Sequence, residues 1–303
     1  GVFLSCGLDS SAVATYVARY IPRLKTFSVG FTDSMIFDER PQARETADFL
    51  GSEHREYSIS PNLPEILPRL VRLYERPYAD SSALAVYCLA EQARREVTVV
   101  LGGDGGDEAF GGYLRYAYWN ILRYFKRDAY EAIASYSYFP PRGRAQSFHS
   151  LDAVFAHGIR TFLVDDLLIK IDRATMAHGL EMRSPFLDRA LMEFSASLPA
   201  SWKIGLFGTK RILRNALRGV VPSTVFRGMK RGFEVPVDEW FRDKWHSWAR
   251  EILLDGRTAR RGYFAREQIE LILYEHRENL RNHGQRIWLL LCFELWNREF
   301  MDR

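Results

Sequence analysis

The sequence predicts an α/β protein: a parallel, twisted sheet with helices on both faces, followed by a mostly helical C-terminal half. Short apolar runs alternate with helical patterns over residues 1–112, and such alternation favours parallel strands covered by helices. The run at residues 97–101 ends in Val-Val-Leu, a continuous apolar character that is typical of a strand buried on both faces. Beyond about residue 113 helical periodicity dominates and strand signals fade, which predicts the helical half.

Each predicted element follows from its local pattern. Residues 2–4 form a short apolar strand that leads into a tight loop, and residues 12–19, which lack Gly and Pro, form a helix. The other predicted elements are strands at 25–31, 54–59 and 97–101 and helices at 41–50, 65–74 and 82–94. Gly51 is well placed to end the helix at 41–50, because glycine commonly closes a helix in the left-handed conformation.

Composition and charge exclude several classes of protein. The 303 residues are 47% hydrophobic and 26% charged, which indicates a globular chain and not a disordered one. A net charge of +4 does not by itself argue for nucleic acid, and the basic residues are not interleaved with aromatic ones on an evident platform. The three cysteines lack metal-ligand spacing, which predicts free thiols in a reducing compartment. We see no signal peptide and no membrane span, and we expect a cytoplasmic protein.

A candidate phosphate loop lies at residues 5–11, Ser-Cys-Gly-Leu-Asp-Ser-Ser, where the first strand feeds the first helix. Unpaired N–H groups at a helix N-terminus carry partial positive charge and stabilise a phosphate, and small residues let the backbone approach it closely. Asp9 suits such a site only beside a magnesium ion, which it would bind. The alternative is a plain strand-to-helix turn. The loop is not a Walker loop, because no Gly-Lys-Ser/Thr follows.

This heptapeptide is similar to Ser-Gly-Gly-Leu-Asp-Ser-Ser, the pyrophosphate-binding loop of ATP pyrophosphatases, which cleave ATP between the α- and β-phosphates. Cys6 stands where that pattern has glycine. A Cβ atom disfavours a positive φ, so either the backbone is regular at Cys6 or phosphate binding is weakened.

A second glycine cluster, at residues 101–113, follows the fourth predicted strand and holds six glycines and three acids. In open α/β sheets ligands bind outside the carboxyl ends of the strands, so both loops can face one crevice. Acids in this place can hold magnesium or orient a nucleophile. The alternative is a flexible acidic loop.

The two loops and their separation resemble the asparagine synthetase (glutamine-hydrolysing) family, in its C-terminal synthetase domain of the ATP-pyrophosphatase type. Segments 165–173, 181–188 and 227–233 extend the resemblance from residue 1 to about residue 300. It implies an adenine nucleotide α-hydrolase-like fold and a ligase in which ATP adenylates the side-chain carboxylate of aspartate, pyrophosphate leaves, and ammonia attacks to give asparagine and AMP. Two alternatives are open: an amide-forming enzyme of the β-lactam synthetase kind that acts on another carboxylate, and an inactive nucleotide-binding relative.

The resemblance also implies roles for individual residues. Lys230 matches the family lysine that contacts the α-phosphate, and Asp104 lies near the amino-acid substrate at a position that is often Glu. Asp9 and Asp107 match magnesium ligands. The residues that match nucleotide or pyrophosphate contacts are Phe3, Ser5, Gly7, Asp9, Ser10, Val29, Gly30, Gly102, Gly103 and Arg173. The alternatives are a solvated basic loop for Lys230, a core strand for Val29, and a surface salt bridge for Arg173.

The same resemblance implies one domain over residues 1–303, with a nucleotide-binding α/β core at 1–112 and a mostly helical part at 113–303. It implies ATP and Mg²⁺ as cofactors, with aspartate and ammonia as the other substrates, and a homodimer is compatible with it. Because the chain starts inside a strand pattern without Met, we expect a longer parent protein with an N-terminal glutaminase domain. We expect neither nucleic acid nor membrane as a partner. A buried ion pair between Arg183 and Asp188 would explain those two residues as structural.

Overall fold

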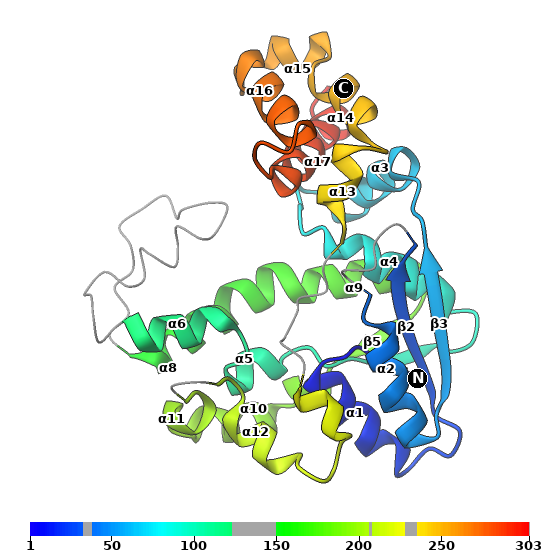
Figure 1. Cartoon of the computed structure of the whole chain (residues 1–303), viewed down its shortest axis with the longest axis vertical. Helices are drawn as coiled ribbons and strands as arrows, with labels where there is room; N and C mark the ends of the chain where they lie inside the picture. Colours follow the sequence, from blue (N-terminus) through cyan, green and yellow to red (C-terminus); the bar gives the residue numbers. More distant parts are fainter. Residues whose placement is uncertain (33–37, 123–149, 206–207, 228–234, 303) are drawn as a thin grey trace.

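The computed structural model describes residues 1–32, 38–122, 150–205, 208–227 and 235–302, and only the backbone of 119–122. Five parallel strands form one sheet in the order β3-β2-β1-β4-β5 (Figure 1). The strands are β1 Val2–Phe3, β2 Lys25–Phe31, β3 Glu53–Ile59, β4 Val99–Leu101 and β5 Glu181–Arg183. The prediction of a parallel sheet is therefore confirmed, with the first strand at its centre.

Helices cover both faces of the sheet, as predicted. Alternate residues of a strand point to opposite faces, and the two faces here have separate cores. On one face, α1 (Leu8–Ala18) and α2 (Arg40–Leu50) pack against β1 through residues such as Ala12 and Val2. On the other face, α4 (Ser82–Ala93) packs against Phe27 and Val100.

The boundaries of the predicted elements are largely confirmed, with one informative shift. Gly51 ends α2 with φ of 61°, in the left-handed conformation that the sequence predicts. The first helix begins at Leu8 and not at residue 12, because part of the candidate phosphate loop is already helical. The side chain of Asp9 therefore projects from the first turn of α1.

Strand β5 was not predicted, and its composition explains why. Glu181 and Arg183 are exposed, so Met182 alone turns toward the sheet core. Charged residues on an edge strand discourage pairing with other chains, but they also erase the apolar pattern by which strands are recognised. Since β5 lies beyond residue 112, the sheet draws on both halves of the chain.

The second half is mostly helical, as predicted. A continuous helical stretch crosses the molecule as α8 (Leu151–Gly158), the π-helical η1 (Ile159–Leu168) and α9 (Ile169–Met176). The shorter elements around it are α5 Gly106–Phe110, α6 Leu114–Leu122, η2 Pro185–Leu187, α10 Arg189–Ser197, α11 Ala200–Lys203, α12 Arg211–Ala216 and η3 Ser223–Phe226. Together they place residues from distant parts of the sequence around the carboxyl ends of the strands.

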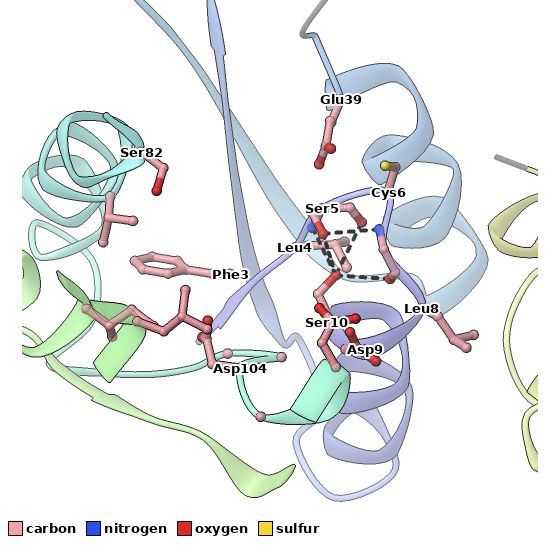
Figure 2. A pocket seen from close by; sticks show the side chains of 18 of the residues that line it. Phe3, Leu4, Ser5, Cys6, Leu8, Asp9, Ser10, Glu39, Ser82 and Asp104 are labelled. Carbon is pink, nitrogen blue, oxygen red and sulfur yellow. Dashed lines mark hydrogen bonds between the residues drawn. The ribbon is translucent and has the colours of Figure 1, made fainter. Parts of the chain in front are cut away.

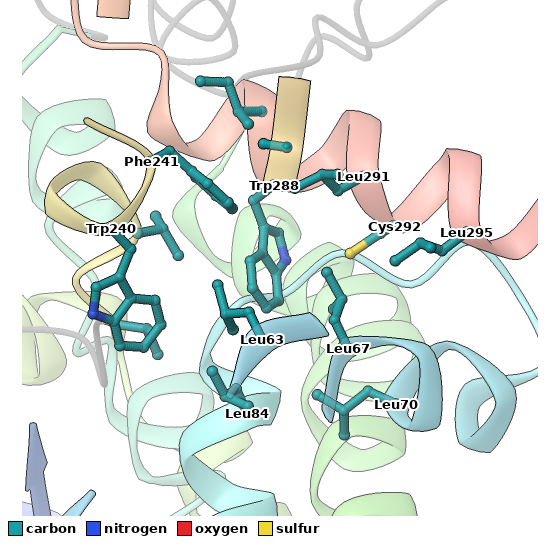
Figure 3. Close-up of a cluster of buried hydrophobic side chains, with 14 of the residues drawn as sticks. Leu63, Leu67, Leu70, Leu84, Trp240, Phe241, Trp288, Leu291, Cys292 and Leu295 are labelled. Atoms are coloured by element: carbon teal, nitrogen blue, oxygen red, sulfur yellow. The ribbon is translucent and has the colours of Figure 1, made fainter. Parts of the chain in front are cut away.

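The C-terminal helices pack against α3 (Leu63–Tyr74) and α4, at one end of the molecule in Figure 1. They are α13 Val237–Arg242, α14 His246–Leu253, α15 Gly256–Arg261, α16 Arg266–Arg277 and α17 Gly284–Phe300. Figure 3 shows Trp288 of α17 and Trp240 of α13 among leucines of α3, and this core fixes the end of α3 that leads to the site. Among the described helices, none has the length and apolar character needed to cross a membrane.

The buried pair between Arg183 and Asp188 is contradicted. Both residues are exposed, and Arg183 pairs with Glu181 at 2.7 Å. Asp188 instead caps α10, since one of its carboxylate oxygens accepts hydrogen bonds from the N–H groups of Ala190 and Leu191 at 3.0 and 3.2 Å. Its role is local and structural, because the first N–H groups of a helix have no partner within the helix.

Replacing Asp188 by Ala is expected to lower the free energy of unfolding by about 1 kcal/mol, the usual value of an N-cap. Urea unfolding curves would measure it, with Asp188→Asn as the matched control, since Asn keeps an oxygen that can accept both bonds. Equal midpoints for the wild type and Asp188→Ala would show that the cap contributes nothing.

Candidate active site

A cavity of about 450 Å³ opens at the carboxyl ends of the central strands (Figure 2). The first loop and strands β1 and β2 contribute the predicted residues Phe3, Ser5, Gly7, Asp9, Ser10 and Val29 to its wall. The second glycine cluster contributes Gly102, Gly103, Asp104 and Asp107. The structure thus brings the two loops to one cavity, as the sequence predicts.

The first loop is held in shape by its own serines. The hydroxyls of Ser5 and Ser10 lie 2.8 Å apart, the Ser5 N–H donates to Ser10 Oγ at 3.2 Å, and the Gly7 N–H donates to Ser5 Oγ at 3.1 Å. Cys6 is not among the described residues with a positive φ, so the backbone there is regular. Of the two alternatives for Cys6, a regular backbone and a weakened phosphate site, the regular backbone is the one found.

The two glycine-rich loops touch each other directly. A Cβ atom on Gly103 would lie 2.7 Å from the backbone nitrogen of Ser10 and 2.8 Å from Cβ of Asp9. A Cβ atom on Gly106 would lie 2.6 Å from Cγ of Asp9. Only glycine permits this approach, which explains why the cluster is so rich in it.

Lys210 joins the two loops electrostatically. Its buried ammonium forms an ion pair with Asp9 and another, at 2.7 Å, with Asp107 Oδ1. The backbone of Lys210 is left-handed, with φ of 53°, a conformation that costs a non-glycine residue free energy and is found preferentially at functional sites. Ser5, Asp9, Ser10, Asp107 and Lys210 form what we call the loop end of the cavity.

The chemistry of the loop end fits a magnesium ion. Asp9 Oδ1 is buried and has no hydrogen-bond partner in the described part of the chain, so it is available to a cation. No group of three or more His, Cys, Asp or Glu side chains that could hold a metal occurs among the described residues. Magnesium does not need such a group, because one or two carboxylates together with substrate phosphates and waters suffice.

The opposite end of the cavity, the Lys170 end, is formed by Asp80, Ser82 and Lys170, and Asp104 lies close enough to both ends for its charge to interact with Lys170 and with Asp9. Burial raises the pKa of Asp104 to about 6; the charge of Lys170 opposes this effect and that of Glu108 adds to it. Asp104 therefore faces the cavity interior, where solvation is poor. A carboxylate with such a pKa can accept a proton near neutral pH.

Two predicted residues, Gly30 and Arg173, are described by the structure but do not line the cavity. Gly30 is not among the lining residues, and its Cα faces the ion pair of Asp38 and Arg40. Arg173 is also absent from the lining and instead joins α9 to the end of α3, through the Leu73 carbonyl at 2.9 Å and Glu75 at 3.1 Å. This placement favours a surface salt bridge for Arg173 over the predicted contact with pyrophosphate. Lys230 lies outside the described residues.

Sequence reasoning missed Lys210, Asp80, Ser82, Lys170 and the pair of Glu108 and Tyr113, which are linked by a 2.6 Å hydrogen bond at the cavity wall. Lys170 lies in segment 165–173, which carries part of the family resemblance, but nothing in that segment marks it as a cavity residue. A signal for Lys210 exists in Gly-Thr-Lys-Arg at residues 208–211, where a lone lysine precedes a helix. That pattern is too common to be specific.

Comparisons with known proteins agree with this geometry. A family model described as asparagine synthase matches residues 1–298. Asparagine synthetase [glutamine-hydrolyzing] 1 of Bacillus subtilis (strain 168) is 30% identical over 98% of this chain, and a putative asparagine synthetase of Mycobacterium tuberculosis (strain H37Rv) is 30% identical over all of it. The human asparagine synthetase is 27% identical over 80% of the chain.

These alignments cover 55%, 55% and 41% of the three relatives, so the chain spans about half the length of the curated relatives it matches. The resemblance that the motifs indicate is confirmed across almost the whole sequence. With its parallel sheet and its paired glycine loops, this chain belongs to the asparagine synthase family.

Proposed function

We propose that this chain is an ATP-dependent, amide-forming synthetase that adenylates the side-chain carboxylate of aspartate and passes the acyl group to ammonia. One observation carries the proposal: a phosphate loop, two acids bridged by a lysine, and a carboxylate with a raised pKa share one cavity. The products would be asparagine, AMP and pyrophosphate.

In the first step, a carboxylate oxygen of aspartate attacks the α-phosphorus of ATP, and the bond to the bridging oxygen of pyrophosphate breaks. Negative charge then develops on the leaving group, and donors placed beforehand stabilise it. The N-terminus of α1, the hydroxyls of Ser5 and Ser10, and the ammonium of Lys210 lie at the loop end for this purpose. Asp9 and Asp107 would hold a magnesium ion, which supplies charge neutralisation for the phosphates.

In the second step, ammonia attacks the acyl carbon, a C–N bond forms, and AMP leaves with its pair of electrons. The attacking nitrogen must lose a proton. Asp104 is suited to accept it, because burial has raised its pKa to about 6 and it lines the same cavity. Lys230 keeps its predicted contact with the α-phosphate as part of this proposal.

The proposed role of Asp104 predicts a pH dependence. Because its pKa is raised to about 6, Asp104 is ionised above that pH and protonated below it. The rate of asparagine formation, at constant free ammonia, should therefore fall about tenfold per pH unit below about pH 6. Asp104→Asn should be slower at neutral pH and should lack this acid limb. A limb that persists in Asp104→Asn would assign the titration to another group.

We also propose that a glutaminase domain in the parent protein supplies the ammonia. The relatives are named as glutamine-hydrolysing enzymes, and the chain spans about half of their length. In the absence of that domain, free ammonium should support the reaction of this chain.

The proposal is tested by AMP and pyrophosphate release from the purified chain with ATP, magnesium and ammonium, with and without aspartate. AMP release that requires aspartate, together with asparagine as product, would support it, and Lys230→Ala should abolish that release. A folded chain that releases AMP only with a different carboxylic acid would point to an amide-forming enzyme of other specificity. Tight ATP binding without AMP from any acid would point to an inactive relative.

A further inference from the structure

Lys170 is held rigidly at the wall of the cavity. Its Nζ donates to Asp80 Oδ2 at 2.8 Å and to Ser82 Oγ at 2.9 Å, and Asp80 Oδ1 accepts from the N–H and the hydroxyl of Ser82 at 2.9 and 2.7 Å. The backbone carbonyl of Lys170 also accepts from the Tyr74 hydroxyl at 2.8 Å. The C-terminal end of α3 and the N-terminal end of α4 thus fix this lysine, and only 8% of its surface is exposed.

An ammonium group has three N–H donors, and Asp80 and Ser82 occupy two of them. The described part of the chain shows no third acceptor for this ammonium, which leaves one donor for a ligand in the cavity. A buried lysine whose position is already fixed binds a partner with little further loss of side-chain entropy. Lys170 is therefore prepared to bind an anionic or polar group of a ligand.

The position of Lys170 argues against a phosphate as this ligand. Figure 2 shows Ser82 across the cavity from Ser5 and Ser10. The loop end already contains a helix N-terminus and Lys210 for phosphates. At the other end, Lys170 and Asp80 present one positive and one negative group side by side. This arrangement matches the head group of an α-amino acid, which carries a carboxylate and an ammonium.

We propose that Lys170, clamped by Asp80 and Ser82, sets the substrate specificity by binding the α-carboxylate of the amino acid, while the side-chain carboxylate points toward the phosphate loop. The negative charge of the Asp80 carboxylate stabilises the positively charged α-ammonium of the same amino acid. The inference rests on the proposed function, and it narrows the substrates to α-amino acids with a second carboxylate.

The test compares aspartate with β-alanine, which is aspartate without its α-carboxylate, in the wild type and in Lys170→Met. The variant should raise the KM for aspartate about 10- to 100-fold, as expected for one hydrogen bond to a charged group, and should change kcat much less. The KM for ATP and any turnover of β-alanine should stay close to the wild-type values, because neither involves the α-carboxylate. Lys170→Arg, which keeps the charge, should recover part of the preference for aspartate.

Lys203→Met is the matched control. Lys203 is as deeply buried as Lys170, with 3% of its surface exposed, but it lies over the ring of Phe155 and outside the cavity lining. Its replacement should leave the KM for aspartate unchanged.

Three outcomes would overturn the inference. If Lys170→Met lowers turnover of aspartate and β-alanine equally, or lowers kcat without raising the KM for aspartate, the lysine is merely structural. If Lys170→Met does not fold, Lys170→Gln, which keeps hydrogen-bonding groups but carries no charge, takes its place, and an unchanged KM for aspartate in that variant leads to the same conclusion. A wild-type chain that releases no AMP with aspartate overturns the proposed function itself, and this inference with it.

Discussion

Lys210→Met is expected to slow AMP release by about 10²- to 10³-fold, the usual effect of removing one donor that stabilises transition-state charge. The ammonium of Lys210 lies between Asp9 and Asp107, at the end of the cavity where pyrophosphate would leave. Methionine has nearly the same length but carries no charge. The loss should appear in kcat as well as in kcat/KM, because the charge on the leaving group develops during the reaction.

The same substitution has a second readout that does not require turnover. Without Lys210, Asp9 and Asp107 lose the counter-ion that they share, and breaking such a largely buried ion pair costs about 3–5 kcal/mol. Added magnesium, without ATP, should therefore raise the melting temperature of Lys210→Met more than that of the wild type, since the two acids have lost the positive charge of the ammonium and gain more from a bound cation.

Arg211→Met is the matched control for Lys210→Met. It removes a cation from the next residue, whose side chain is exposed and does not line the cavity. Equal losses of activity in the two variants would attribute the effect to the general charge of α12. A Lys210→Met enzyme with wild-type kcat would contradict the role of Lys210 in stabilising the leaving group.

Most of the fold could be predicted from the sequence, because strands and helices of the first half have strong local patterns. The apolar run at 97–101 and the helix stop at Gly51 are examples, and both are confirmed. Strand β5 could not be predicted in this way. Glu181 and Arg183 make it resemble a loop, and its pairing with β4 depends on a partner about 80 residues earlier in the chain.

The residues of the candidate site also fall into those that a local pattern predicts and those that it does not. Contiguous motifs revealed the two glycine-rich loops, since the spacing of small residues and acids is itself the signal. Lys210 and Lys170 were not predicted, because their roles depend on distant partners. Lys210 pairs with Asp9, 201 residues away, and Lys170 with Asp80, 90 residues away. The motif around Arg173 was visible in the sequence, but the side chain of Arg173 pairs with Glu75 and does not line the cavity. Local patterns thus locate loops, whereas tertiary packing decides which side chains meet.

Gly103→Ala is expected to lower the activity about 100-fold or more, as expected when a small displacement spoils the alignment of reacting groups. The cause is steric alone, because Gly103 is not among the described glycines with a positive φ. Its new methyl group would lie 2.7 Å from the Ser10 backbone nitrogen, and a backbone atom cannot move aside as the end of a side chain can. The second loop must therefore shift away from the N-terminus of α1.

This shift should also reduce the free energy of unfolding by about 1–3 kcal/mol, as overpacking usually does. Gly256→Ala is the matched control, since its methyl group would have only the end of the Arg260 side chain nearby, at 3.5 Å, and α15 lies far along the chain from both loops. Activity and urea unfolding should be measured for both variants. If Gly103→Ala loses stability but keeps its turnover, the contact between the loops serves folding, and the phosphate-binding geometry does not depend on it.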